Sequence, residues 1–302
     1  MIEVKNVTKK FGDFTAVEDV SFMVEDSSIY GLIGYNGAGK TTLLKTAAGI
    51  YKPDRGKVLL DGENSYDNGD VRQGLFYIPD DMYFMTNSTV ESMAKFYKGM
   101  FSSFDGELFD RILTLFSLNK RARLRSFSKG MKRQAEIAFA LASRPEFMLL
   151  DEVFDGLDPQ KKETCKNLFL EYIAESKCSI IISSHSLSDI GGICDHVGLV
   201  NGKRLSFSCS IDDIPTVNRK FQIIFSAPVK KEVLAAMPVK KLQVQGNGAT
   251  FHVLGADNLK RVQQAMQALP VAEIKPTAMT LEEVFLSEME GDGYDLQQIF
   301  TK

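Results

Sequence analysis

The stretch GYNGAGKTT, from Gly34 to Thr42, constrains this chain more strongly than any other part of its sequence. It fits the spacing G-x-x-x-x-G-K-[ST], with an apolar strand-like run (IYGLI) before it and an apolar helical run (LLKTAAGI) after it. Its glycines let successive backbone N–H groups point into one hollow, and the following helix adds the positive end of its dipole. We therefore predict a phosphate-binding loop (P-loop) formed by Gly34, Asn36, Gly37, Ala38, Gly39, Lys40, Thr41 and Thr42.

A second motif, FMLLDE at 147–152, supplies carboxylates for the same chemistry. Its run of four apolar residues predicts a strand covered on both faces, which ends at Asp151 and Glu152. In P-loop proteins a lysine at the position of Lys40 reaches the β- and γ-phosphates, and the hydroxyl of Thr41 ligates Mg²⁺. Asp151 is placed to hold Mg²⁺ through water, and Glu152 to polarise the attacking water. An exposed acidic turn is the alternative for this pair.

The size and composition of the chain indicate two domains and a reducing compartment. Its 302 residues exceed one average domain. A net charge of -3 gives no electrostatic reason to expect nucleic acid as a partner, and the four cysteines are widely spaced. The sequence shows neither a secretory signal nor an apolar run of about 18 residues. We expect a cytoplasmic protein that reaches the membrane only through a partner.

The order of elements predicts a larger domain over 1–210 and a smaller one over 218–302. Strands and helices alternate in the first, which indicates an α/β fold of P-loop type with a mixed sheet. At about 82–142 we expect a helical subdomain, because apolar residues repeat at three- and four-residue intervals from Thr89 to about Phe116. After a linker near 211–217, the order β-α-β-β-α-β and a last helix indicate a ferredoxin-like α+β domain with a regulatory or assembly role.

Three further motifs narrow the choice between kinases, GTPases and motors that a P-loop alone leaves open. They are FSKGM at 127–131, GLDP at 156–159 and the dipeptide Ser184-His185. Together with the P-loop and FMLLDE they stand in the order typical of the nucleotide-binding domain of the ATP-binding cassette (ABC) family, which residues 1–210 therefore resemble. FSKGM matches the family's signature loop LSGGQ at Ser128 and Gly130, and departs from it at Lys129 and Met131.

The resemblance implies a role for each matching residue. Glu152 takes the position of the catalytic glutamate, His185 that of the switch histidine at the γ-phosphate, and Asp158 that of the D-loop aspartate. Phe11 matches the aromatic residue that stacks on adenine. The resemblance also implies ATP and Mg²⁺ as cofactors, and two such domains that meet head to tail, each ATP lying between the P-loop of one and the signature loop of the other. Closure of the pair then needs ATP, and hydrolysis lets it open.

One position departs from the family in a way that bears on catalysis. In the family a glutamine, within a pattern resembling YIPQ, contacts Mg²⁺ and water and couples the site to the membrane partner. Here YIPD puts Asp80 at that place, followed by Asp81. A carboxylate can still accept from metal-bound water, although beside a triphosphate it adds like charge. We expect Asp80 to act in catalysis and as a metal ligand, with ATPase activity that survives under an altered metal or coupling dependence.

The two ends of the chain narrow the resemblance further. A complete cassette followed by a small domain with PTAMTLEEVFLSEM is similar to the ATPase subunits of bacterial exporters whose permease is a separate chain. This implies an integral membrane permease and a second ATPase subunit, identical or not, as partners, and a peripheral location on the inner face of the membrane. The helical subdomain would be the docking face, with Phe84 and Met85 as candidates, although an apolar stripe of helical spacing is more often plain core.

Two other classes of function stay open. A soluble cassette ATPase acting on DNA or ribosomes would need a long coiled coil or a second cassette in the chain, and the sequence shows neither. A nucleotide sensor would keep the P-loop and lose the hydrolytic residues, whereas Glu152 and His185 are both retained.

Overall fold

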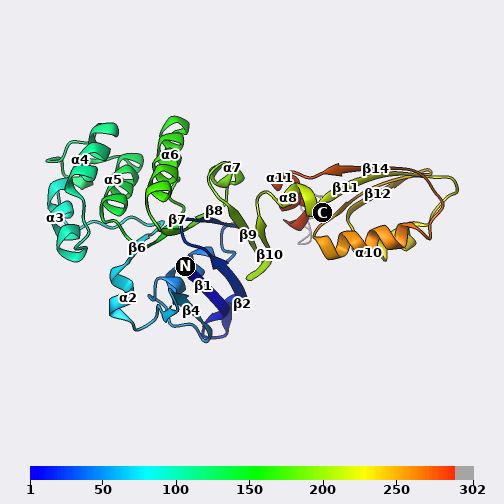
Figure 1. Cartoon of the computed structure of the whole chain (residues 1–302), viewed down its shortest axis with the longest axis horizontal. Coiled ribbons are helices and arrows are strands. Elements are labelled where there is room, and N and C mark those ends of the chain that lie inside the picture. Colours follow the sequence, from blue (N-terminus) through cyan, green and yellow to red (C-terminus); the bar gives the residue numbers. More distant parts are fainter. Residues whose placement is uncertain (290–302) are drawn as a thin grey trace, which may run out of the picture. The chain divides into compact units, whose positions relative to one another are not determined.

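A computed structural model describes residues 1–289, and the chain divides into two compact units, Met1–Ser208 and the part from Cys209 onward (Figure 1). Residues 290–302, the last part of the second predicted domain, lie outside the described residues. The predicted α/β cassette with a helical subdomain and the small α+β domain after it are confirmed. Within residues 1–289, no helix combines the length and apolar character needed to cross a membrane.

Two sheets form the frame of the first unit. The antiparallel sheet has the order β2-β1-β4-β5, with strands β1 (Ile2–Phe11), β2 (Phe14–Val24), β4 (Arg55–Leu60) and β5 (Glu63–Asn64). The other sheet has the order β10-β9-β3-β8-β7-β6, with strands β3 (Ile29–Ile33), β6 (Leu75–Ile78), β7 (Phe147–Asp151), β8 (Ser179–Ser184), β9 (His196–Asn201) and β10 (Arg204–Ser210). Strands β3, β7 and β8 run parallel and are buried throughout, as their continuous apolar runs predict.

A core cluster joins these two sheets to helix α1 (Lys40–Ala47), which follows the P-loop. It includes Val4 of β1, Leu32 of β3, Leu44 of α1 and Ile181 of β8. Because the strand before the P-loop and the helix after it both pack into this cluster, the loop between them is held at a fixed place at the carboxyl end of β3.

The helices of the first unit gather around the second sheet. They are α2 (Gly69–Gln73), α3 (Val90–Met100), α4 (Gly106–Leu115), the 3₁₀ turn η1 (Leu124–Ser126), α5 (Lys129–Ala142), α6 (Pro159–Glu175) and α7 (Leu187–Ile190). Figure 1 shows α3, α4 and α5 grouped together as the helical subdomain. The predicted helical section from Thr89 to Phe116 is two helices, because Asp105 caps a new helix through the amide of Leu108. Phe96 and Met100 of the expected apolar stripe are exposed.

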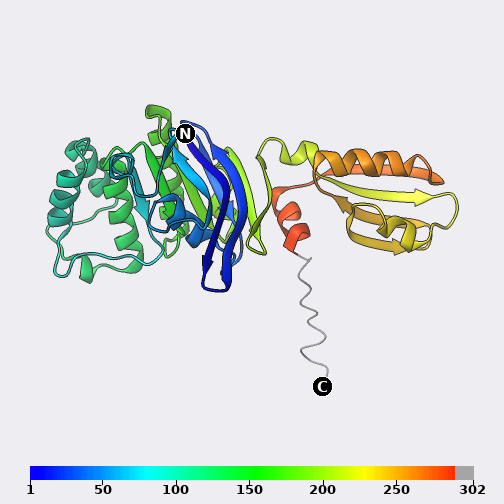
Figure 2. The same ribbon diagram turned by 90° about the horizontal axis from the view of Figure 1, so that it is seen from below.

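The second unit has the ferredoxin-like order that its sequence predicts. Its elements are β11 (Arg219–Phe225), α9 (Lys231–Ala235), β12 (Lys240–Gln245), β13 (Gly248–Val253), α10 (Ala256–Met266), β14 (Val271–Ala278) and α11 (Leu281–Met289). The antiparallel sheet has the order β12-β13-β11-β14, so that β12 and β14 are its edges. One face packs against α10 (Figure 2), in a core that contains Phe221, Leu234, Phe251 and Val262. Part of the expected linker is helical, as α8 (Ile214–Val217).

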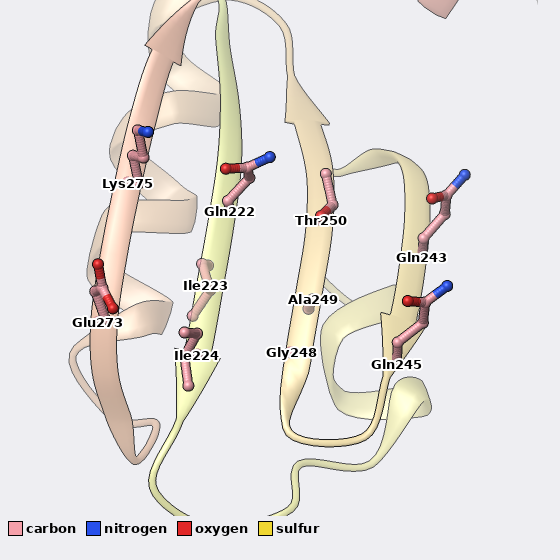
Figure 3. Close-up of a pocket in the computed structure, with 10 residues that line it drawn as sticks. All are labelled: Gln222, Ile223, Ile224, Gln243, Gln245, Gly248, Ala249, Thr250, Glu273 and Lys275. Atoms are coloured by element: carbon pink, nitrogen blue, oxygen red, sulfur yellow. The ribbon is translucent and has the colours of Figure 1, made fainter.

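The other face of this sheet is polar and partly covered by α11. Ser287 of α11 lies 2.7 Å from His252 Nδ1, and Glu288 lies 3.1 Å from Lys240. Figure 3 shows a hollow on the rest of this face, which is lined mainly by polar side chains together with Ile224: Gln222, Gln243, Gln245, Thr250, Glu273 and Lys275. This hollow contains none of the predicted site residues.

Candidate active site

The P-loop connects β3 to α1 in the conformation that its glycines predict. The backbone φ angle is 84° at Gly37 and 107° at Gly39, which is the N-cap of α1. A Cβ atom at Gly39 would come within 2.5 Å of the carbonyl oxygen of Ala16, so a larger residue does not fit. The ammonium group of Lys40 donates to the carbonyl of Gly34 at 2.7 Å. The loop therefore curls around the lysine that is predicted to bind phosphate.

The remaining predicted loop residues follow the same path. Asn36 is exposed, Ala38 is buried, and Thr41 and Thr42 are half-buried in the first turn of α1.

Three predicted site residues from different elements meet at Glu152. Its Oε1 lies 3.2 Å from Lys40 Nζ, and its Oε2 lies 2.9 Å from His185 Nδ1. Glu152 follows β7 and His185 follows β8, and these strands are adjacent and parallel, so that their carboxyl ends lie side by side. Lys40 and Glu152 are 5% and 9% exposed. The P-loop, the acidic strand end and the histidine thus form one compact cluster.

Ser183 of β8 holds both carboxylate-bearing residues of FMLLDE. Its hydroxyl donates to Asp151 Oδ1 at 2.6 Å and accepts from the amide of Glu152 at 3.1 Å. Glu152 has a φ of 47°, in the left-handed region that non-glycine residues rarely adopt. Asp151 is fully buried. The pKa of Tyr77, whose hydroxyl lies 3.5 Å from Asp151 Oδ2, is raised first by the burial of Tyr77 itself and then by the charge of Asp151. Ser183 of β8 therefore stabilises both the left-handed backbone of Glu152 and the buried carboxylate of Asp151.

The predicted signature and D-loop residues lie apart from this cluster but close to each other. Ser128 is exposed and caps α5 through the amide of Met131 at 3.2 Å. A Cβ atom at Gly130 would come within 2.7 Å of the carbonyl oxygen of Gly156, so the two turns touch. Asp158 caps α6 through the amide of Lys161, which lowers the pKa of that carboxyl. Among residues 1–289, no hydrogen bond or ion pair joins the side chains of Ser128 and Asp158 to the P-loop of the same chain.

Asp80 lies just beyond β6, next to the acidic end of β7. Ile78 of β6 is in register with Leu150 of β7, which places Asp80 beside the Asp151–Glu152 segment. Burial and then the charge of Asp151 raise the pKa of Asp80, against the opposing effect of Arg133. The Asp80 carboxylate lies 3.9 Å from the Arg133 guanidinium.

Phe11 lies at the tip of the hairpin between β1 and β2, where it pairs with Phe14. Its ring is 46% exposed and packs edge-on against Tyr51, with centroids 5.4 Å apart. An exposed aromatic ring is available to stack on a base, and the contact between Gly39 and Ala16 brings the start of β2 next to the P-loop.

Comparisons with known proteins agree with this architecture. A family model described as ABC transporter matches residues 17–155. The bacitracin transport ATP-binding protein BcrA of Bacillus licheniformis is 31% identical over 73% of this chain and 73% of its own length. The chain belongs to the ABC transporter family.

Another relative matches this ABC protein nearly end to end, and a solved structure matches most of it. The ABC transporter ATP-binding protein YtrB of Bacillus subtilis is 27% identical over 96% of this chain and 99% of its own length. A solved structure of an ATP-binding subunit of an ABC transporter has a TM-score of 0.66 at 28% identity, and covers 72% of this chain and 92% of that chain. The protein is therefore an ATP-binding subunit of this family, and an ATPase.

The residues of this ABC subunit fit a magnesium ion with a nucleotide. Mg²⁺ prefers hard oxygen ligands, and the motif offers the Thr41 hydroxyl and the Asp151 carboxylate. Asp151 Oδ1 accepts from Ser183, and its Oδ2 lies 3.5 Å from the Tyr77 hydroxyl, which leaves lone pairs for metal-bound water. The oxygen and nitrogen atoms of Glu152, Asp155 and His185 also lie within 4.8 Å of one another. Thr41 and Asp151 would hold the ion, which supplies positive charge to the phosphates when bound.

Two buried polar residues of the cassette, Ser183 and Arg133, were not among the predicted site residues. Ser183 lies in the apolar run SIIISS, where a polar residue in a strand buried on both faces needs a hydrogen-bonding partner. Arg133 is buried in α5 together with Glu136, and charged residues within a run of buried positions give the same signal. The sequence thus indicates that both residues need a polar partner, but it does not show which residue that partner is.

Proposed function

We propose that this ATPase works as a pair with a second cassette subunit and powers a membrane exporter whose permease is a separate chain. The observation that carries the proposal is the contact of Lys40, Glu152 and His185 at the carboxyl ends of β3, β7 and β8. A sensor that only binds nucleotide has no need of a buried glutamate at this place, with a histidine 2.9 Å away.

Hydrolysis would use these residues in a definite order. Before nucleotide binds, Lys40 forms an ion pair with Glu152 and donates hydrogen bonds to the carbonyls of Gly34 and Tyr35. A triphosphate in the P-loop competes for Lys40, and so frees one oxygen of Glu152 to accept a proton from water. His185 keeps the other oxygen in place, since its ring nitrogen and backbone amide both face it.

Pairing of two cassettes is supported by the predicted nucleotide-binding residues that, among residues 1–289, form no hydrogen bond or ion pair with the Lys40 cluster. Ser128 and Asp158 are exposed, and Ser128 lies at the N-terminus of α5. Backbone amides and the dipole at such an end favour an anionic group, which the neighbour's γ-phosphate would supply. ATP would thus hold the two cassettes together through its γ-phosphate, and hydrolysis would break this link by cleaving off the γ-phosphate.

Docking to the permease would use the exposed apolar residues between β6 and α3 and on α3 itself. Tyr83 is 81% exposed, Met85 43% and Met100 55%, and Phe84, which lies between Tyr83 and Met85 in the chain, is half-buried. Contiguous exposed apolar groups are typical of interaction sites. We expect alanine at Met85 and Phe84 to reduce recruitment to membranes that contain the permease. Unchanged recruitment would count against this face.

The test of the central proposal is Glu152→Gln. The amide keeps the shape of the side chain but cannot accept the proton, so ATP should bind without turnover and hold a dimer together. Light scattering after size exclusion with Mg²⁺ and ATP should show a stable dimer for this variant and a monomer for Lys40→Ala, which lacks the phosphate-binding ammonium. A monomeric Glu152→Gln protein, or one that hydrolyses ATP at the normal rate, would overturn the proposal.

A soluble ATPase without a permease is the second candidate. Its discriminating observation is the neighbouring gene, since a membrane protein of six helices encoded beside this chain supports transport and its absence favours the soluble class. Within residues 1–289 the longest helix is α6, with 17 residues, too short for a long coiled coil of the type such ATPases need.

A further inference from the structure

Arg133 is fully buried in α5, the helix that begins at the signature loop. Its Nη1 donates to the carbonyl of Pro79 at 2.8 Å, and its Nη2 donates to the carbonyl of Asp80 at 3.0 Å. Both carbonyls belong to the segment that leaves β6 and carries Asp80. One planar guanidinium therefore ties two consecutive residues of that segment to the signature helix, a geometry that a lysine ammonium cannot reproduce.

The same guanidinium makes an ion pair that is costly to bury. Its Nη1 lies 3.0 Å from Glu136, which is itself buried. Its Nε has no hydrogen-bond partner within residues 1–289, so one donor is buried without a compensating hydrogen bond. Apolar residues of similar size often replace such a pair without loss of stability. Stability alone does not explain why this position holds an arginine.

The register of the sheet shows what the contact controls. Because Ile78 is opposite Leu150 in parallel strands, the Asp80 segment leaves the sheet beside Asp151 and Glu152. A small shift of this segment moves the Asp80 carboxylate relative to that acidic end. Two hydrogen bonds donated by Arg133 link the backbone of this segment to α5.

We infer that Arg133 is a positioning residue for ATP hydrolysis, which orients the Asp80 carboxylate toward the Asp151–Glu152 edge by holding the backbone of Pro79 and Asp80. The inference rests on the proposed ATPase function and on the prediction that Asp80 acts in hydrolysis. It does not depend on pairing of cassettes or on a permease.

The first test compares Arg133→Lys with Arg144→Lys. Arg144 follows α5 and binds a carboxylate, Asp105, at 2.9 Å, but among residues 1–289 it forms no hydrogen bond or ion pair with the Asp80 segment. Arg133→Lys should lower kcat about tenfold, since a misplacement near 1 Å in an active site costs up to about a hundredfold. The KM for ATP should change less than about twofold, because the P-loop is untouched, and Arg144→Lys should keep normal turnover.

The second test asks whether Arg133 acts through Asp80. In an Asp80→Ala background, Arg133→Lys should add little further loss of kcat, since the group that it positions is gone. Losses that multiply in the double variant, or an equal loss in Arg144→Lys, would overturn the inference. A missing Glu152→Gln dimer would instead speak only against the pairing of cassettes.

Hydrogen exchange, which does not depend on ATPase activity, tests the inference if Arg133→Lys is poorly stable. Arg133→Gln combined with Glu136→Gln removes the buried charge together with its partner, and so avoids an unpaired carboxylate. Hydrogen exchange of a peptide spanning residues 76–85 should become at least about tenfold faster in this variant than in Arg144→Lys, because the two clamped carbonyls are released. Unchanged exchange there would overturn the inference as well.

Discussion

Ser183 makes two hydrogen bonds to the acidic end of β7, and an alanine would remove both. The hydroxyl fixes the Asp151 carboxylate and supports the left-handed backbone at Glu152. We predict that Ser183→Ala lowers kcat for ATP about 10- to 100-fold and changes KM much less, because the binding loop is intact.

Ser184→Ala is the matched control for this prediction. Ser184 follows Ser183 in β8 and is equally buried, but its hydroxyl contacts Asp189 and the amide of Ser186 instead. Steady-state kinetics of both variants should separate the two positions. A similar kcat loss in both would mean that the strand, rather than the Ser183 contacts, is what matters.

Glu136 gives the first unit a dependence of stability on pH. Burial raises its pKa to about 7 from 4.5, against the opposing effect of Arg133, and Tyr97 faces the same carboxyl. Between these values the folded state binds more protons than the unfolded state, so the free energy of unfolding falls as pH rises and levels off above about 7. The loss is at most about 3 kcal/mol, from roughly 1.4 kcal/mol for each pH unit.

We therefore predict that Glu136→Gln removes this pH dependence. Urea unfolding of the first unit at pH 5, 6 and 7.5 should show a stability that declines in the unmodified protein and stays nearly level in the variant. An unchanged decline in Glu136→Gln would assign the effect to another group.

At the scale of elements, the start of α5 depends on its approach to the turn before α6. Gly130 has no room for a Cβ atom, which would lie 2.7 Å from the carbonyl oxygen of Gly156. We predict that Gly130→Ala lowers the free energy of unfolding by about 1–3 kcal/mol, the usual cost of forcing extra volume into a packed site. Denaturant unfolding measures the effect.

Gly99→Ala provides the comparison, because α3 leaves open space around Gly99. Alanine there should raise stability by about 0.5–1 kcal/mol through helix propensity. Equal effects at both glycines would show that the contact between the two turns is loose.

The elements also show how far the sequence alone leads. The apolar runs IYGLI, FMLLDE and SIIISS predict the buried strands that carry the site, because residues covered on both faces must be apolar. The break between α3 and α4 and the exposure of Phe96 and Met100 were not predictable from spacing, since an amphipathic pattern does not say which neighbour covers it. The pairing of Arg133 with Pro79 and Asp80 joins distant parts of the chain, and no local pattern contains it.

For the whole molecule, two compact units with separate cores should unfold separately. The first core contains the P-loop helix, and the second contains Phe221 and Phe251 but no predicted nucleotide ligand. We predict two calorimetric transitions, of which Mg²⁺ with ATP raises only one. At a hundredfold excess over Kd the stabilisation is about 2.7 kcal/mol. A single transition that shifts as a whole would contradict this prediction.

The order β12-β13-β11-β14 also leaves the second unit with two open edges, which invite strand addition between molecules. Pro276 interrupts the row of amide donors on β14, and Lys275 adds a charge beside it. On β12 the register shifts between Lys240 and Gln243, and that irregular, lysine-bearing stretch is a poor template for a further strand. Both edge strands are thus protected against pairing with another molecule, so we expect this unit not to aggregate through its sheet edges even at high local concentration.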